Sequence, residues 1–151
     1  MLFKGKIEGI EKKITFNSKR ILVLTSKNVS KKKRIYYFLK KLKKKNKVDI
    51  FNSIKAGAYL NDLKKIIKFQ LPDIILAIGG GSVIDIAKAL SCTMKSGKIK
   101  QDTLSKFNNK IELIVIPTVS GTGSESSKGA ILQYENRKKF ALRSPALIPN
   151  K

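Results

Sequence analysis

The sequence contains no histidine, no tryptophan and a single cysteine, Cys92, among its 151 residues. One cysteine excludes an internal disulfide framework, and without imidazole the chain offers no Cys/His zinc site and no histidine-based catalytic triad. Cys92 lies in the stretch LSCTMK, where we expect a buried, inert thiol rather than a nucleophile. Any chemistry in this chain must therefore proceed without a histidine.

Acidic residues and long apolar runs are also scarce. The chain has 10 Asp and Glu against 33 Lys and Arg, a formal charge of +23. No apolar run approaches the roughly 20 residues of a membrane helix, and the start MLFKGKIEGIEKK lacks the apolar stretch of a signal peptide. With 42% hydrophobic residues, we expect one soluble, cytoplasmic domain over residues 1–151, without membrane contact.

The lysines are densest between residues 31 and 47. In that segment Ile35, Phe38, Leu39 and Leu42 recur at helical spacing, which indicates one buried stripe with lysines on the solvated faces. A basic module for nucleic acid or another polyanion is the alternative, because such a charge attracts polyanions at low salt. Aromatic or Arg-rich base-reading patterns are missing, so we expect no specific nucleic-acid partner.

Apolar segments alternate with helical patterns along the chain. Strands are expected at 21–25, 48–51, 73–80 and 111–118, and helices near 29–45, 57–69 and 82–94. This alternation predicts an α/β fold, a doubly wound, mostly parallel Rossmann-like sheet with helices on both faces. A β-hairpin around Glu135 and Asn136 is expected near the C-terminus, and 95–110 is expected to be a surface connection with at most a short helix.

Three consecutive glycines in AIGGGSVIDIAK follow an apolar run that ends at Ile78. Glycine has no Cβ, so its backbone N–H can approach a ligand closely. The helix that begins directly afterwards adds N–H donors and a partial positive charge, which favour a phosphate or pyrophosphate. Ser82 stands where it either caps this helix or donates to the same anion. The alternative is a plain strand-to-helix turn, because neither G-x-G-x-x-G nor a Walker A loop is present.

A second polar loop follows another apolar segment. PTVSGTGSESS, residues 117–127, places six hydroxyl residues and two glycines in eleven positions. Loops at the carboxyl ends of adjacent parallel strands converge on one crevice, so both glycine-rich loops are expected to line one site. A flexible Ser/Gly loop or linker is the alternative, although the preceding VIPT segment argues against a linker.

Together, GGGSVIDIAK at 79–88 and PTVSGTGSE at 117–125 resemble the iron-containing, metal-dependent alcohol dehydrogenase family, with support from ILVLTS and KKFALRSPALIP. The resemblance implies an NAD- or NADP-dependent oxidoreductase that interconverts an alcohol and an aldehyde or ketone. It implies that Gly80, Gly81 and Ser82 hold the cofactor pyrophosphate and that Thr118, Thr122 and Ser127 lie along its ribose and nicotinamide side. Lys139 looks like the family lysine that contacts the cofactor. The roles of Asp85 and Lys88 stay open between the site rim and helix packing.

Two departures from the family pattern concern the cofactor. Ser26 stands where the family often has an Asp that holds the adenosine ribose, so a 2′-phosphate is no longer repelled and Lys27 is placed to attract it. We therefore expect NADP to serve as cofactor no less than NAD. After VDIF, the segment NSIKAGAYL replaces a Pro-containing stretch of the family, which leaves the adenine-side loop undefined.

A third departure concerns the metal. The family holds Fe²⁺ or Zn²⁺ with one Asp and three His in a helical domain, and all four ligands would follow residue 151. We therefore expect that this chain is truncated before that domain, retains cofactor binding only, and is inactive and marginally stable alone. A remnant without function is a further alternative. A homodimer is expected only for the full-length form.

Overall fold

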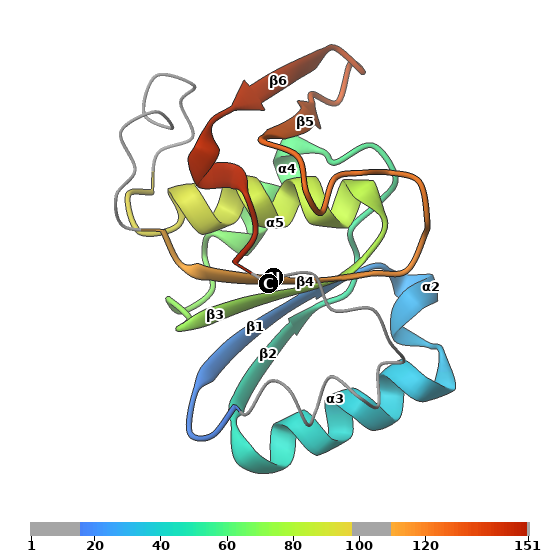
Figure 1. The fold of residues 1–151 in the computed structure, drawn as a ribbon, viewed down its shortest axis with the longest axis vertical. Coiled ribbons are helices and arrows are strands. Elements are labelled where there is room, and N and C mark those ends of the chain that lie inside the picture. The colour runs from blue at the N-terminus through green and yellow to red at the C-terminus, as the bar shows by residue number, and fades with distance from the viewer. Residues whose placement is uncertain (1–15, 98–109, 151) are drawn as a thin grey trace.

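The computed structural model describes residues 16–97 and 110–150. Four parallel strands form the main sheet in the order β2-β1-β3-β4 (Figure 1). Their bounds are β1 Arg20–Thr25, β2 Lys47–Phe51, β3 Ile74–Gly79 and β4 Glu112–Pro117. The predicted connection over 95–110 lies mostly outside the described residues.

Helices cover both faces of this sheet, as the sequence pattern predicts. Ile21 and Val23 of β1 pack with the stripe of α3 (Lys33–Lys45), whereas Leu22 and Leu24 pack with α4 (Leu60–Ile66) and α5 (Gly81–Thr93). Side chains alternate between faces, so a strand buried on both faces reads as one continuous apolar run. The predicted α/β, doubly wound, Rossmann-like fold is confirmed. No helix in the described part of the chain is long and apolar enough to cross a membrane.

Helix α5 lies between the sheet and a two-stranded hairpin (Figure 1). The hairpin consists of β5 (Gly129–Gln133) and β6 (Lys139–Arg143), and a 3₁₀ turn, η1 (Pro145–Leu147), follows it. Apolar side chains of all three, including Leu132, join the core around α5. A helix that is covered on both sides must be apolar almost all round, and ten of its thirteen residues are buried. The predicted hairpin around Glu135 and Asn136 is confirmed.

Two predicted helices have different boundaries in the structure. The lysine-rich helix over 29–45 is two helices, α2 (Lys27–Ser30) and α3, separated by Lys32 in an extended conformation. The helix near 57–69 shortens to α4 because Gly57 and Ala58 have positive φ, +111° and +52°. The end of the described chain pairs with the main sheet. Asn150 donates its N–H to the carbonyl of Leu113 on edge strand β4, and its side-chain oxygen accepts the Leu113 N–H.

Gly79, the last residue of β3, serves packing rather than ligand approach. A Cβ there would lie 2.6 Å from Cγ2 of Val83, in a buried position. We expect Gly79→Ala to lower the free energy of unfolding by about 1–3 kcal/mol, measured by urea denaturation, because the extra carbon overpacks the strand end. Gly129→Ala is the control, since its Cβ would meet only the Leu142 carbonyl at 3.7 Å. An equal loss in both variants would contradict this role for Gly79.

Candidate functional site

The strand order places a topological switch point at the carboxyl ends of β1 and β3. The chain leaves β1 toward β2 on one side and β3 toward β4 on the other, and such a switch point is where open α/β sheets bind ligands. The strand ends are tied together by two hydrogen bonds. Thr25 Oγ1 donates to the Ile78 carbonyl at 2.7 Å, and the Thr118 N–H donates to the Gly79 carbonyl at 3.0 Å. Ser26, Gly80 and Thr118 therefore begin neighbouring loops at this edge.

The two glycine-rich loops meet at the start of α5. Gly80 is the N-cap residue, and Gly81 is the first residue of the helix. A Cβ at Gly81 would lie 3.3 Å from Ser124 Oγ and 3.7 Å from Thr122 Cβ, and a Cβ at Gly80 would lie 3.4 Å from Val119. A helix N-terminus carries unpaired N–H groups and a partial positive charge, so it favours an anion. The convergence that the sequence predicts for the loops is present in the structure.

Ser82 does not cap the helix, so that alternative of the prediction is wrong. The cap position belongs to Gly80, which makes no side-chain cap bond. The Ser82 Oγ instead accepts the N–H of Gly57 at 2.9 Å. A hydroxyl that accepts one hydrogen bond still has its own proton to donate. Ser82 therefore remains suited to the predicted role of donor to a phosphate oxygen.

Gly57 lies in NSIKAGAYL, the segment that the sequence analysis left undefined, and the structure shows what holds it. The Ala58 carbonyl accepts the N–H of Gln133 at 3.1 Å, and Tyr59 forms a β-bridge with the same residue. The segment is thus held between α5 and the hairpin, with φ of +111° at Gly57. A Cβ at Gly57 would lie 2.2 Å from Gln133 Nε2. In the sequence, only the single glycine in AGAYL indicates an unusual backbone here. The residues that contact Gly57, Ser82 and Gln133, lie far along the chain, so the sequence does not identify them.

Lys88 and Asp85 connect α5 to the segment after the second loop. The Lys88 side chain is fully buried, and its Nζ donates to the Ser127 carbonyl, Ser127 Oγ and the Gly129 carbonyl at 2.8, 2.9 and 2.9 Å. Asp85 Oδ2 accepts the Ile131 N–H at 3.1 Å. The sequence left the roles of both residues open, and these contacts show that each joins α5 to the segment 127–131.

The pKa values of this pair shift toward the neutral forms. Burial lowers the pKa of Lys88, and the carboxylates of Asp85 and Glu125 oppose that shift. Burial raises the pKa of Asp85, against the hydrogen bond from Ile131, the charge of Lys88 and the hydrogen bond with Ser124. In both cases desolvation of the charged form is the largest cause.

Several other predicted cofactor residues already have hydrogen-bond partners. Ser127 Oγ donates to the Gly129 carbonyl at 3.1 Å besides accepting from Lys88, and Thr122 Oγ1 donates to Glu125 Oε2 at 3.4 Å. Ser26 is the N-cap of α2, and its Oγ accepts the Val29 N–H at 3.4 Å. Lys139 lies exposed at the start of β6, opposite Gln133, on a strand separate from both loops. Their roles toward a cofactor stay predictions.

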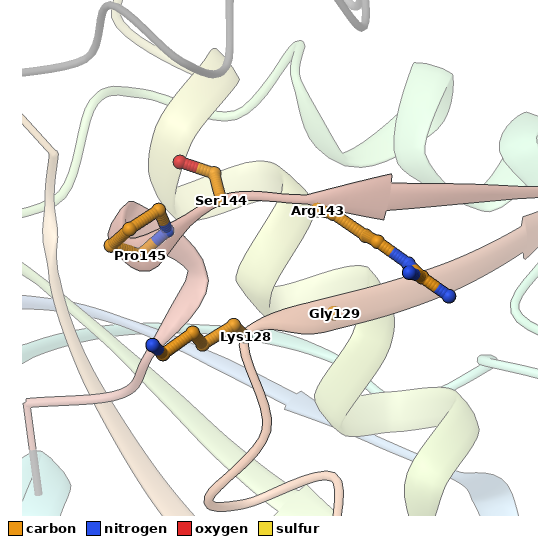
Figure 2. A pocket seen from close by; sticks show the side chains of 5 residues that line it. All are labelled: Lys128, Gly129, Arg143, Ser144 and Pro145. Atoms are coloured by element: carbon orange, nitrogen blue, oxygen red, sulfur yellow. The ribbon is translucent and has the colours of Figure 1, made fainter.

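A shallow hollow lies at the opposite end of the hairpin. It has a volume of about 460 Å³ and is lined by Lys128, Gly129, Arg143, Ser144 and Pro145. Figure 2 shows the side chains of Lys128 and Arg143 pointing away from each other. Two cations that diverge do not form a site for one anion. The residues at the strand ends remain the better candidate site.

The residues that the structure describes, 16–97 and 110–150, do not fit Fe²⁺ or Zn²⁺. The sequence has no histidine, and the described residues hold no group of three or more Cys, Asp or Glu side chains that could bind a metal ion. Both ions need three or four such ligands in one place. These residues therefore supply no metal for a chemical step at this site.

Cys92 is buried, and its Sγ donates to the Ala146 carbonyl at 3.5 Å. Burial raises the pKa of this thiol above its ordinary 9.0. We expect no reaction with the thiol reagent DTNB at pH 8 in the folded chain and complete reaction in urea, because the thiolate is the reactive form. Because the unfolded chain loses this proton at a lower pH than the folded chain, ionisation of Cys92 favours unfolding. The free energy of unfolding is therefore unaffected by this group below pH 9 and decreases as the pH rises toward the raised pKa. Rapid stoichiometric labelling of the native chain would contradict this environment.

Known proteins resemble this chain in sequence and in structure. Residues 1–151 match the family model for iron-containing alcohol dehydrogenase. An alcohol dehydrogenase from Thermococcus barophilus is 35% identical over 105 residues, 56% of this chain and 28% of that protein. A mitochondrial hydroxyacid-oxoacid transhydrogenase from Xenopus laevis is 30% identical over 150 residues, 89% of this chain and 32% of that protein.

A solved structure supports the same relationship. The crystal structure of an iron-containing alcohol dehydrogenase from Thermotoga maritima superposes with a TM-score of 0.75 at 27% identity, covering 95% of this chain and 41% of that chain. The chain thus spans between 28% and 41% of the length of these three relatives. Because the family match extends over all 151 residues, the chain belongs to the iron-containing alcohol dehydrogenase family.

Proposed function

We propose that this chain binds NAD(H) or NADP(H), with the cofactor pyrophosphate at the start of α5. The observation that carries the proposal is the approach of the second loop to Gly81, where a Cβ would lie 3.3 Å from Ser124 Oγ. Backbone N–H groups of a helix N-terminus, the proton of the Ser82 hydroxyl and the hydroxyl-rich loop then face one small region. That combination suits a pyrophosphate followed by a ribose.

The proposed reaction of the whole protein is hydride transfer between the nicotinamide and a small alcohol, aldehyde or ketone. The two relatives described above are named for an alcohol and for a hydroxyacid with an oxoacid, so hydroxyl and carbonyl compounds are the proposed substrate class. A family metal would polarise the substrate oxygen as a Lewis acid, but its ligands are not among these 151 residues. The proposed role of this chain is to hold and orient the cofactor.

Cofactor preference depends on the end of β1. Ser26 carries no charge, and Lys27 follows it at the start of α2, so a 2′-phosphate meets no repulsion there. We propose that NADPH binds at least as tightly as NADH. A carboxylate introduced by Ser26→Asp should shift the preference toward NADH.

A fluorescence titration tests the proposal. NADH and NADPH are titrated into the folded chain at about 0.15 M salt and again at higher salt, with nicotinamide fluorescence as the signal. We expect saturable binding that depends weakly on salt. Polyanion binding by the lysines of α3 would instead fall steeply as salt rises. Absence of saturable binding by a demonstrably folded chain would overturn the proposal.

A further inference from the structure

We propose, on the basis of the proposed cofactor site, that Lys88 is a positioning residue that holds the second loop against the start of α5. The loop in question is residues 118–127, and Lys88 touches its last residue. Lys88 itself lies seven residues after Gly81 on the same helix, about two turns away. One rigid helix would therefore present its N-terminus to the cofactor and fasten the loop that covers it.

The hydrogen bonding of Lys88 is complete. An ammonium group has three donors, and the structure gives Nζ three acceptors between 2.8 and 2.9 Å: the Ser127 carbonyl, the Ser127 hydroxyl and the Gly129 carbonyl. All three belong to the junction between the loop and β5. All three donors of the Lys88 ammonium group therefore bond to residues 127–129, which fixes the position of this segment relative to α5.

The loop is fastened at its other end as well. The Thr118 N–H donates to the Gly79 carbonyl at 3.0 Å, which ties the start of the loop to the end of β3. Between these two anchors, Thr122 and Ser124 lie within 4 Å of a Cβ built on Gly81. Release of the Lys88 anchor would leave the loop tied at its start and through the hydrogen bond between Asp85 and Ser124, so Thr122 and Ser124 would be held less firmly opposite the helix N-terminus.

A role in packing alone does not explain a lysine at this position. Burial of an ammonium group costs free energy, and well-packed apolar residues often replace a buried charge without loss of stability. Lys88 is fully buried, and most of its neighbours on α5 are apolar or small, with the carboxylate of Asp85 one turn before it; a methionine of similar length would fill the space. What methionine lacks is the three donors.

The test uses Lys88→Met in the full chain, with Lys64→Met on the exposed side of α4 as the matched control. Endoproteinase Glu-C reports on the loop, because Glu125 lies inside it, while Glu112 within β4 reports on global unfolding. We expect Lys88→Met to speed cleavage after Glu125 at least tenfold relative to cleavage after Glu112. We also expect it to raise the Kd for NADPH at least tenfold, with Lys64→Met unchanged in both.

The outcomes separate this inference from the proposed function. Equal cleavage ratios and an equal Kd in a folded Lys88→Met chain would overturn the positioning role. Faster cleavage after Glu125 in a chain that binds neither dinucleotide even as wild type would support the anchor and overturn the cofactor proposal. If Lys88→Met fails to fold, Ser127→Ala removes one of the three acceptors and keeps the lysine. An unchanged cleavage ratio in that variant would then overturn the inference.

Discussion

Gly81→Asp should weaken the binding of NADH and NADPH by about 100-fold or more, equivalent to about 2.8 kcal/mol at about 1.4 kcal/mol per factor of ten. A Cβ at this position already lies 3.3 Å from Ser124 Oγ, so the rest of the side chain must enter the space between the helix and the loop. Its carboxylate would also stand beside the pyrophosphate, and such a like-charge juxtaposition costs several kcal/mol. The nicotinamide fluorescence titration described above measures the change.

Two controls separate the steric effect from the charge. Gly81→Ala adds only the Cβ, and a shift of a few tenths of an ångström by the Ser124 hydroxyl accommodates it, so we expect less than a tenfold loss. Asn61→Asp adds the same charge at an exposed position of α4 that belongs to neither loop, and should leave binding unchanged. Equal affinity of wild type and Gly81→Asp would show that the cofactor does not lie at this helix N-terminus.

Much of the fold was predictable from short-range patterns. The two central strands of the main sheet, β1 and β3, contain the apolar runs ILVLT and IILAIG, because both faces are buried. The stripe Ile35, Phe38, Leu39 and Leu42 is buried as its helical spacing predicts. The three glycines mark the end of a strand and the start of a helix within one residue. These features depend on residues that are close in sequence, so local chemistry determines them.

The contacts that shape the candidate site were not predictable in the same way. Ser82 meets Gly57 across 25 residues, and Lys88 meets Ser127 and Gly129 across 39 and 41 residues. Each is a polar group whose partner is backbone or a common hydroxyl, so no residue type in the sequence marks the pair. Likewise, Ala58 has a positive φ in a segment that is held by Ser82 of α5 and Gln133 of β5, and both partners lie far along the chain. Sequence motifs indicated the candidate site, whereas tertiary packing determines which hydrogen bonds its side chains make.

Leu90→Ala should destabilise the fold by about 2–5 kcal/mol, out of a total of about 5–15 kcal/mol for a typical domain. Leu90 is completely buried in the core around α5, which joins the sheet to the hairpin, so the lost methyl groups leave a cavity that little can fill. Leu71→Ala is the control, because that side chain is 50% exposed and should change stability by less than about 0.5 kcal/mol. Urea denaturation followed by circular dichroism measures both values.

Cofactor binding should recover much of that loss, because a ligand that binds only the folded chain stabilises it. At 100 times the Kd, NADPH adds about 2.7 kcal/mol, comparable to the lower half of the range expected for Leu90→Ala. The double variant Gly81→Asp/Leu90→Ala should gain almost nothing from the same NADPH, since the first substitution removes the site. Equal stabilisation of the single and double variants would place the dinucleotide somewhere other than the start of α5. Recovery confined to the single variant would link the stability of the buried helix directly to the ligand at its N-terminus.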